Sequence, residues 1–172
     1  MSQTQVERLF IEDRTSLMHD LFRLTATVSS SSAENPTTIT SNLERADDTQ
    51  AGHLGTGMSE SSGIFTFPST GIYKITANFQ YLRNNAAIRY CGGYIMSTSN
   101  NFTSEDALTG NFASLNDAAS HYQNVTMSCV YDVTDLSNNK CKFLYQCSDG
   151  FILASDSNSN YTYFTFQRLA DT

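Results

Sequence analysis

GIFTFPSTGIYKITANFQY, residues 63 to 81, decides how this chain folds. From Tyr73 to Tyr81, apolar or aromatic side chains occupy the odd positions and polar side chains occupy the even positions. A β-strand directs successive side chains to opposite faces, so this period of two predicts a strand with one buried and one wetter face. Pro68 and Gly71 predict a turn between this strand and an earlier, shorter one.

The length and composition describe one domain whose surface is polar but weakly charged. The chain has 172 residues, of which serine, threonine and asparagine supply 56. Charged residues make up 16%, below the roughly 25% that is usual in soluble domains. Small neutral hydrogen-bonding side chains suit turns, exposed strand faces, and surfaces that meet saccharides or other proteins.

Charge and hydropathy argue against two classes of partner. The formal net charge is -7 and the basic residues are scattered, whereas nucleic-acid binding needs clustered lysine and arginine. No run of about 18 apolar residues occurs, so we expect no membrane partner through a spanning segment. Residues 1–16 lack the basic start and apolar core of a secretory signal, so we expect synthesis and initial residence in a cytosol.

Four cysteines, Cys91, Cys129, Cys141 and Cys147, allow three complete sets of disulfide pairs. A straight strand would hold Cys141 and Cys147 about 20 Å apart, which excludes a bond between them. We expect buried free thiols, because cysteine packs as a small apolar residue and a cytosol disfavours oxidation. No Cys-x-x-Cys spacing indicates zinc, and we expect no cofactor.

Residues 1–20 differ from the rest of the chain and are interpreted as an N-terminal arm, partly helical or irregular. The residues with approximate helical spacing are Val6, Leu9, Phe10 and Leu17. Two interpretations are open: a frayed arm, or a docking segment that becomes ordered on a partner. The predicted domain then covers residues 21–172.

From Leu21 onward the pattern predicts short strands separated by turn-rich loops. The longest are expected at residues 21–28, 73–81, 86–99, 125–133, 140–147 and 161–170. Gly92 and Gly93 predict a kink or bulge, and residues 100–120 predict a polar loop with room for a short strand. The final strand is aromatic on both faces, as in a central strand or one buried in an assembly. Eight to ten short strands predict an all-β sandwich or jelly roll.

Five residues of the opening stretch carry a resemblance to a known family. Gly63, Phe65, Pro68, Gly71 and Tyr73 are similar to the central motif of the complement C-one-q and tumour necrosis factor superfamily. In that motif Gly-x-Phe-x-x-Pro leads through x-x-Gly-x-Tyr into the next strand. Further similar segments follow in the family's order at residues 125–136, 140–150 and 159–170. The resemblance covers roughly residues 21 to 170.

The resemblance implies a single ten-stranded jelly-roll sandwich that assembles as a homotrimer, with aromatic residues near the threefold axis. It makes six residues candidates for packing in the core or at that axis: Tyr73, Ile75, Phe79, Tyr81, Phe164 and Phe166. The chain departs from animal members because it has no Gly-X-Y stalk and no secretory signal. In this respect it looks more like the jelly-roll modules of bacteriophage particles, which decorate capsids or form the tips of fibres and spikes.

The residues give no indication of an enzyme. His19, His53 and His121 lie in no recognisable catalytic motif, and GHLGTG at residues 52–57 lacks the Lys-Ser/Thr ending of a phosphate-binding loop. No Asp-x-Asp-x-Asp sequence indicates calcium, and aspartates are common in turns for their own backbone hydrogen bonds. We therefore expect no catalytic residues and no metal site.

Two functions are compatible with these observations. The first is a structural virion protein, made in the host cytoplasm, whose homotrimeric jelly roll decorates or cements a bacteriophage capsid while the arm docks on a capsid or other virion protein. The second is a recognition tip of a tail fibre, or a secreted ligand-binding head, that contacts a protein or a host-surface saccharide. The residues proposed for recognition are Asn100, Asn101, Tyr122 and Asn158.

Overall fold

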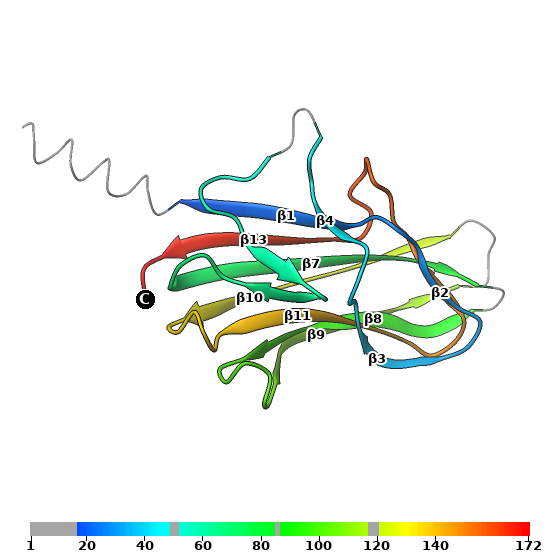
Figure 1. Cartoon of the computed structure of the whole chain (residues 1–172). Coiled ribbons are helices and arrows are strands. Elements are labelled where there is room, and N and C mark those ends of the chain that lie inside the picture. The colour runs from blue at the N-terminus through cyan, green and yellow to red at the C-terminus, as the bar shows by residue number, and fades with distance from the viewer. Residues whose placement is uncertain (1–16, 49–51, 85–86, 117–120) are drawn as a thin grey trace, which may run out of the picture.

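Figure 1 shows the computed structural model of the chain, in which two β-sheets enclose one core. The structure describes residues 17–48, 52–84, 87–116 and 121–172. Within these segments the chain forms thirteen strands and no helix. In chain order they are β1 (Met18–Leu24), β2 (Val28–Ser30), β3 (Glu34–Thr38), β4 (Leu43–Arg45), β5 (Ser59–Ser61), β6 (Ile64–Thr66), β7 (Gly71–Arg83), β8 (Ile88–Thr98), β9 (Asp106–Leu115), β10 (Tyr122–Val133), β11 (Lys140–Cys147), β12 (Phe151–Leu153) and β13 (Tyr163–Ala170).

The strand order confirms the predicted all-β jelly-roll sandwich. One sheet has seven strands in the order β2-β12-β7-β13-β1-β4, with β10 also paired to β7. The other has six strands in the order β5-β6-β11-β8-β9, with β3 also paired to β11. The chain changes sheet repeatedly, as a jelly roll requires. The described residues hold thirteen strands rather than the expected ten. Five of the thirteen, β2, β4, β5, β6 and β12, are only three residues long.

Residues 67–70, FPST, carry the chain from the six-stranded sheet to the seven-stranded sheet, since β6 pairs with β11 and β7 pairs with β10 and β13. Two glycines permit the close approaches around this crossing. Gly63 has a φ of 81°, and a Cβ there would lie 2.0 Å from the carbonyl oxygen of Ile39. Gly71 has a φ of 145°, and a Cβ there would lie 2.6 Å from the carbonyl oxygen of Ala170. Glycine adopts these conformations without the steric cost that other residues meet.

Aromatic rings fill the space between the sheets. Phe65 and Phe143 come from the six-stranded sheet, and Phe164 and Phe166 come from β13 of the seven-stranded sheet. The rings of Phe143 and Phe164 stack with their centroids 3.8 Å apart, and Phe65 lies 5.0 Å from Phe166. The structure places all six candidate packing residues in this core, each with 0% exposure: Tyr73, Ile75, Phe79, Tyr81, Phe164 and Phe166.

Residues 100–120 contain a strand of ten residues, β9, where a polar loop with room for a short strand was predicted. β9 runs over ten residues and pairs with β8 at the edge of the six-stranded sheet. Most of its side chains are exposed or half-buried on both sides of the strand. Leu115 is buried in the core and Leu108 and Ala113 pack against it, but a register shift at Leu108 changes which positions face inward, so the sequence of β9 shows no clear alternation.

Gly92 and Gly93 allow neighbouring strands to approach β8 closely. The strand runs unbroken past both glycines, and its register shifts against β9 fall on either side of them. A Cβ at Gly92 would lie 2.0 Å from the carbonyl oxygen of Asn111. A Cβ at Gly93 would lie 2.2 Å from the carbonyl oxygen of Leu144. The glycines therefore serve close packing, and the predicted irregularity of this strand corresponds to its register shifts against β9, between Ile88 and Cys91 and between Ile95 and Met96.

The first strand begins at Met18, three residues before the expected start at Leu21. Met18 is buried in the core, and the carboxylate of Asp20 is fully buried as well. That carboxylate accepts hydrogen bonds from Arg45 Nε at 2.9 Å and from the backbone N–H of Met58 at 2.7 Å. An aspartate is expected on the surface unless such partners compensate its burial, so the sequence alone could not place Asp20 in a strand.

Candidate functional site

The side of the seven-stranded sheet that faces away from the core is the first candidate site. β10, β7 and β13 lie in register, with Val130 opposite Lys74 and Lys74 opposite Gln167. The side chains that point outward from these strands, which we call the outer face, are Ile72, Lys74, Thr76, Asn78, Gln80, Leu82, Tyr122, Asn124, Thr126, Ser128, Val130, Asp132, Tyr163, Thr165, Gln167 and Leu169. Lys74 and Asp132 are the charged members of this set, so the outer face has no net charge from its Lys, Arg, Asp and Glu residues.

Exposed hydrophobic side chains gather on this side of the molecule. Among the described residues, eight large hydrophobic side chains are exposed. Five of them lie on the outer face or directly beside it, at the start of β1 or just before β13: Leu17, Tyr122, Val130, Tyr161 and Leu169. The other three lie elsewhere: Leu54 pairs with His19 at the edge of β1 away from β13, and Phe112 and Leu136 lie in β9 and in the turn before β11. Apolar side chains concentrated on one exposed face mark a surface that contacts another molecule.

The polar side chains of the outer face are held by one another. The side-chain amide of Asn78 donates to the carbonyl oxygen of Tyr161 at 2.7 Å. The hydroxyl of Thr126 donates to Asn78 Oδ1 at 2.6 Å, and the side-chain amide of Gln80 donates to Asn124 Oδ1 at 3.1 Å. Side chains that are already fixed lose less conformational entropy when a partner covers them.

A shallow hollow lies at one end of the outer face. It has a volume of about 260 Å³ and is lined by Gln80, Tyr122 and Tyr161. The two tyrosines are 59% and 41% exposed. Tyrosine combines a large apolar ring with a hydroxyl group, and it is enriched among the residues that dominate binding at protein interfaces.

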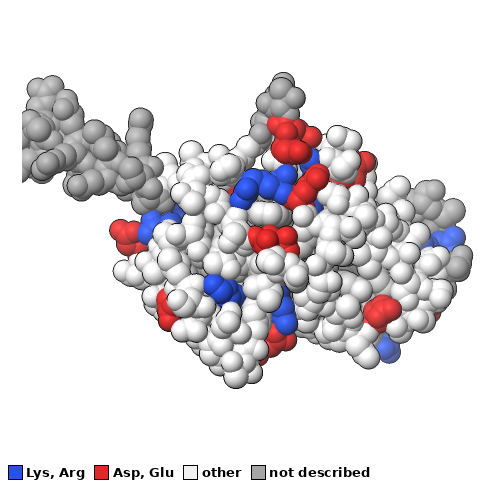
Figure 2. All heavy atoms as spheres, viewed as in Figure 1, with Lys and Arg blue, Asp and Glu red and all other residues white. Residues whose placement is uncertain are grey.

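An ion-pair cluster braces the chain after β4 beside this sheet. The Arg23 guanidinium is fully buried and binds Glu44 at 2.8 Å, Asp47 at 2.8 Å and Asp48 at 2.6 Å. Burial alone would lower the pKa of Arg23, but the hydrogen bonds and charges of Glu44 and Asp48 outweigh it and the net shift is upward. Figure 2 shows charged atoms gathered over β1 and β4, with mostly uncharged surface around them. Because Arg23 holds three carboxylates together, the cluster stabilises the conformation of the chain after β4.

A second hollow opens beside β5 and β6 of the six-stranded sheet. It has a volume of about 400 Å³ and is lined by Ser59, Glu60, Ser61, Ser62, Ile64, Thr66, Asn101 and Lys140. Lys140 Nζ donates to the carbonyl oxygen of Leu136 at 2.6 Å, and a carboxylate oxygen of Glu60 accepts from the backbone of Gly63 at 2.6 Å. Hydroxyl, amide and charged groups in one hollow offer hydrogen bonds to a polar ligand.

The four residues proposed for recognition lie in three parts of the fold. Asn100 is bonded to Ser104 through both its side-chain oxygen and its side-chain nitrogen, at 2.9 and 2.8 Å, so it shapes the loop between β8 and β9. Asn101 lines the second hollow, Tyr122 belongs to the outer face, and Asn158 lies in the loop between β12 and β13. The structure does not bring these side chains into one site.

The predicted docking arm falls mostly outside the described residues, which is where Val6, Leu9 and Phe10 lie. Leu17 is described; it directly precedes β1 and is 50% exposed. Within the described residues, no three His, Cys, Asp or Glu side chains are placed to hold one metal ion. In the same part of the chain, no helix is long and apolar enough to cross a membrane.

Tyr122 and Leu17 were predicted from the sequence as site residues, but the other six exposed hydrophobic side chains of the described residues were not. They are Leu54, Phe112, Val130, Leu136, Tyr161 and Leu169. The sequence held one signal of the outer face. In residues 122–132 the even positions are polar except for Tyr122 and the apolar Val130. An apolar side chain on the wet face of an alternating strand indicates a covered surface.

The comparisons with known proteins bear on the fold. No family model and no curated protein matches the sequence. Among solved structures, Eiger TNF from S. frugiperda superimposes with a TM-score of 0.66 and 13% identity, over 91% of this chain and 95% of that one. The chain has a tumour necrosis factor-like jelly-roll fold. Murine APRIL at pH 5.0 superimposes with a TM-score of 0.62 and 11% identity, over 89% of this chain and 99% of that one. At these identities the likeness establishes the fold and nothing finer.

Proposed function

We propose that the chain is a non-catalytic structural module that assembles as a homotrimer through the outer face of the seven-stranded sheet. The observation that carries this proposal is that five of the eight large hydrophobic side chains exposed among the described residues lie on or directly beside that face. Interface cores are depleted of charged residues, and the charged members of the outer face are Lys74 and Asp132. Trimeric assembly is what the resemblance to the tumour necrosis factor superfamily implies.

The polar part of the outer face is compatible with burial in such an assembly. A stable interface covers about 800 Å² on each partner, so the amides and hydroxyls between the hydrophobic side chains would be covered with them. Burying an unpaired polar group costs free energy, whereas burying a paired one costs much less. Asn78, Gln80 and Asn124 already have partners within the subunit, which lowers this cost.

A matched pair of substitutions tests the face. Ser128 is exposed in β10 on the outer face, and Ser114 is exposed in β9 of the other sheet. Ser128→Glu places a charge inside the proposed interface, where burying it without a partner is costly. We expect Ser128→Glu to lower the oligomer mass in light scattering at micromolar concentration, while Ser114→Glu keeps the wild-type mass. If Ser128→Glu keeps the wild-type oligomer mass and Ser114→Glu lowers it, the assembly interface lies on the other sheet.

We further propose that the trimer is a virion component that decorates or cements a bacteriophage capsid, with the N-terminal arm as its docking segment. The support is the resemblance to phage jelly-roll modules and a surface with many small neutral side chains. Deleting residues 2–16 removes the part of the arm before β1 and leaves every described strand in place. We expect the deletion to abolish binding to capsids while the isolated protein keeps its oligomer mass. Undiminished capsid binding would contradict the docking role.

A recognition head is the second candidate function, and the hollow beside β5 and β6 favours it. That hollow is lined with hydroxyl groups and contains Asn101, one of the predicted recognition residues. A saccharide offers hydroxyl groups that pair with such a lining. Glycan-array signals that Asn101→Ala weakens would support recognition, and particle imaging with density at the tail rather than over the shell would agree with it. An array without signals, together with density over the shell, would support capsid decoration.

A further inference from the structure

Two of the four cysteines face each other across neighbouring strands. Cys91 in β8 and Cys147 in β11 are direct partners in an antiparallel ladder. The backbone N–H of Ser148 donates to the carbonyl oxygen of Tyr90 at 2.9 Å, so residues 90 and 148 form a hydrogen-bonded pair. Paired positions alternate along an antiparallel ladder, so the next pair, Cys91 with Cys147, is non-hydrogen-bonded.

This type of pair has the spacing that a disulfide needs. At a non-hydrogen-bonded pair the Cα atoms lie about 4.5 Å apart and the side chains are closer than at other pairs. Disulfides occur at Cα separations of about 4.4 to 6.8 Å. The ladder therefore presents Cys91 and Cys147 at a bondable separation without any movement of β8 or β11.

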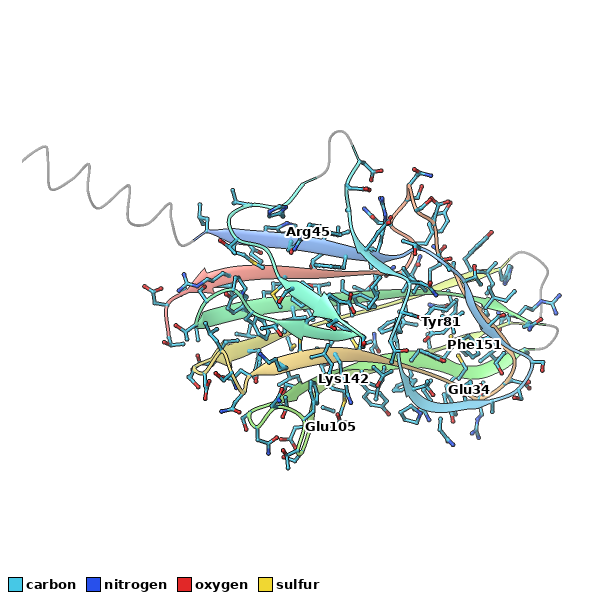
Figure 3. All side chains as sticks on the ribbon, in the orientation of Figure 1. Glu34, Arg45, Tyr81, Glu105, Lys142 and Phe151 are labelled. Atoms are coloured by element: carbon cyan, nitrogen blue, oxygen red, sulfur yellow. The ribbon has the colours of Figure 1, made fainter. Side chains whose placement is uncertain are left out.

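The two thiols also lie on the same, inward side of the sheet. Cys91 is 0% exposed and Cys147 is 1% exposed. A hydrogen bond with Cys91, together with burial, raises the pKa of the Cys147 thiol. Three other titratable groups lie near the two thiols: Tyr81, Tyr145 and Glu34. Tyr81, Glu34 and Phe151, labelled in Figure 3, mark the end of the sandwich where the pair lies.

The other two cysteines lack this arrangement. Cys141 lies opposite Ser97 in β8, and Cys129 lies opposite Ile75 in the other sheet. Cys141 is on the same strand as Cys147 but six residues away, which is about 20 Å along a strand. Only the Cys91–Cys147 combination among the four thiols is a direct cross-strand pair.

We propose that Cys91 and Cys147 are a redox modification site that closes a disulfide between β8 and β11 when the chain folds in the presence of a small-molecule disulfide. In the first step one cysteine thiolate attacks a sulfur of glutathione disulfide, and one glutathione thiolate leaves. In the second step the other cysteine thiolate attacks the mixed disulfide and releases the second glutathione. The two protons lost by the cysteines end on the two glutathione thiols, and no further oxidant is needed.

Folding is the stage at which the site reacts readily. In the folded chain both thiols are buried and Cys147 is held in its protonated form, so exchange with glutathione is slow. Once formed, the bond closes the segment from 91 to 147, which contains all of β9 and β10. Closing a long loop restricts the unfolded chain, and we expect the melting temperature to rise by about 10 °C.

The test is to refold the reduced, unfolded chain in a buffer of reduced and oxidised glutathione, and then to count thiols. The denatured product is alkylated, and the wild-type chain is expected to take two labels where the fully reduced chain takes four. Trypsin with a glutamate-specific protease then locates the bond, because Glu105 separates Cys91 from Cys129 and Lys142 separates Cys141 from Cys147. We expect a linked peptide pair containing Cys91 and Cys147.

Two double variants complete the experiment. Cys129→Ala/Cys141→Ala keeps the pair and is expected to form the bond and show the rise in melting temperature. Cys91→Ala/Cys147→Ala is expected to remain unbonded under the same conditions. Four labels on refolded wild-type chain, a linked peptide containing Cys129 or Cys141, or bonds between chains would each overturn the proposal. An oxidised chain with an unchanged melting temperature would overturn its stabilising effect.

Discussion

Replacing Phe164 by alanine tests the aromatic core on which the two sheets depend. Phe164 has 0% exposure, stacks on Phe143 at 3.8 Å, and meets the rings of Phe79 at 5.7 Å and Phe65 at 6.4 Å. Truncating a buried phenylalanine costs about 3 to 5 kcal/mol, and the loss of several ring contacts places this site near the upper end. We expect a loss of about 4 kcal/mol, out of the roughly 5 to 15 kcal/mol that stabilises a domain.

The same chemical change at Phe112 is the control. Phe112 is 36% exposed in the edge strand β9, and its aromatic contacts among the described residues are edge-to-face contacts with Tyr90 and Tyr94. We expect Phe112→Ala to cost about 1 kcal/mol. Guanidinium denaturation at matched protein concentration measures both, with a shifted midpoint and an unchanged slope as the sign of a stability effect. Equal losses in the two variants, or a loss below about 1.5 kcal/mol for Phe164→Ala, would refute the assignment of Phe164 to the core.

Three further predictions address single contacts. Gly63→Ala, with its backbone clash at a positive φ, is expected to lower the free energy of unfolding by about 2 kcal/mol or more in denaturant titrations, whereas Gly52→Ala, with nothing within 4 Å, should leave it nearly unchanged. Asp20→Ala removes the buried carboxylate that pairs with the partly exposed Arg45 and leaves the buried backbone N–H of Met58 without its acceptor, and we expect a loss of about 3 kcal/mol by the same measurement; full stability would contradict these contacts of the Asp20 carboxylate. Burial raises the pKa of Cys129 to about 11 against 9.0 for a free thiol, so alkylation of native Cys129 at pH 8 should be about 100-fold slower than in the unfolded chain. The free energy of unfolding should also fall between about pH 9 and 11, because in that range only the thiol of the unfolded chain ionises. Equal alkylation rates in the native and unfolded chain would contradict the burial of Cys129.

The fold was largely predictable because its central strands are buried on one face. The alternation from Tyr73 to Tyr81 is present in the sequence, and the structure places those odd positions in the core. β9 was not predictable by the same reasoning, because most of its side chains are exposed and its inward residues Leu108, Ala113 and Leu115 change phase at a register shift. The burial of Asp20 depends on Arg45, which is distant in sequence, so no local pattern reveals it.

The candidate site was less predictable than the fold, since a shared face depends on which strands pair. Val130, Tyr161 and Leu169 come from different segments and meet on one side only because β10, β7 and β13 are neighbours. The same holds for Cys91 and Cys147, whose facing positions follow from the pairing of β8 with β11. Strand neighbours and register are long-range properties, whereas the period of two is a local one.

The central claim is that the tumour necrosis factor-like jelly roll works as an assembled trimer, and native mass spectrometry of the full chain tests it most directly. Three copies of the 19.0 kDa chain give an expected mass of about 57 kDa. We predict this mass at micromolar concentration for the wild-type chain and a shift toward the single-chain mass for Ser128→Glu. A wild-type chain whose mass stays at 19.0 kDa at micromolar concentration would contradict trimeric assembly.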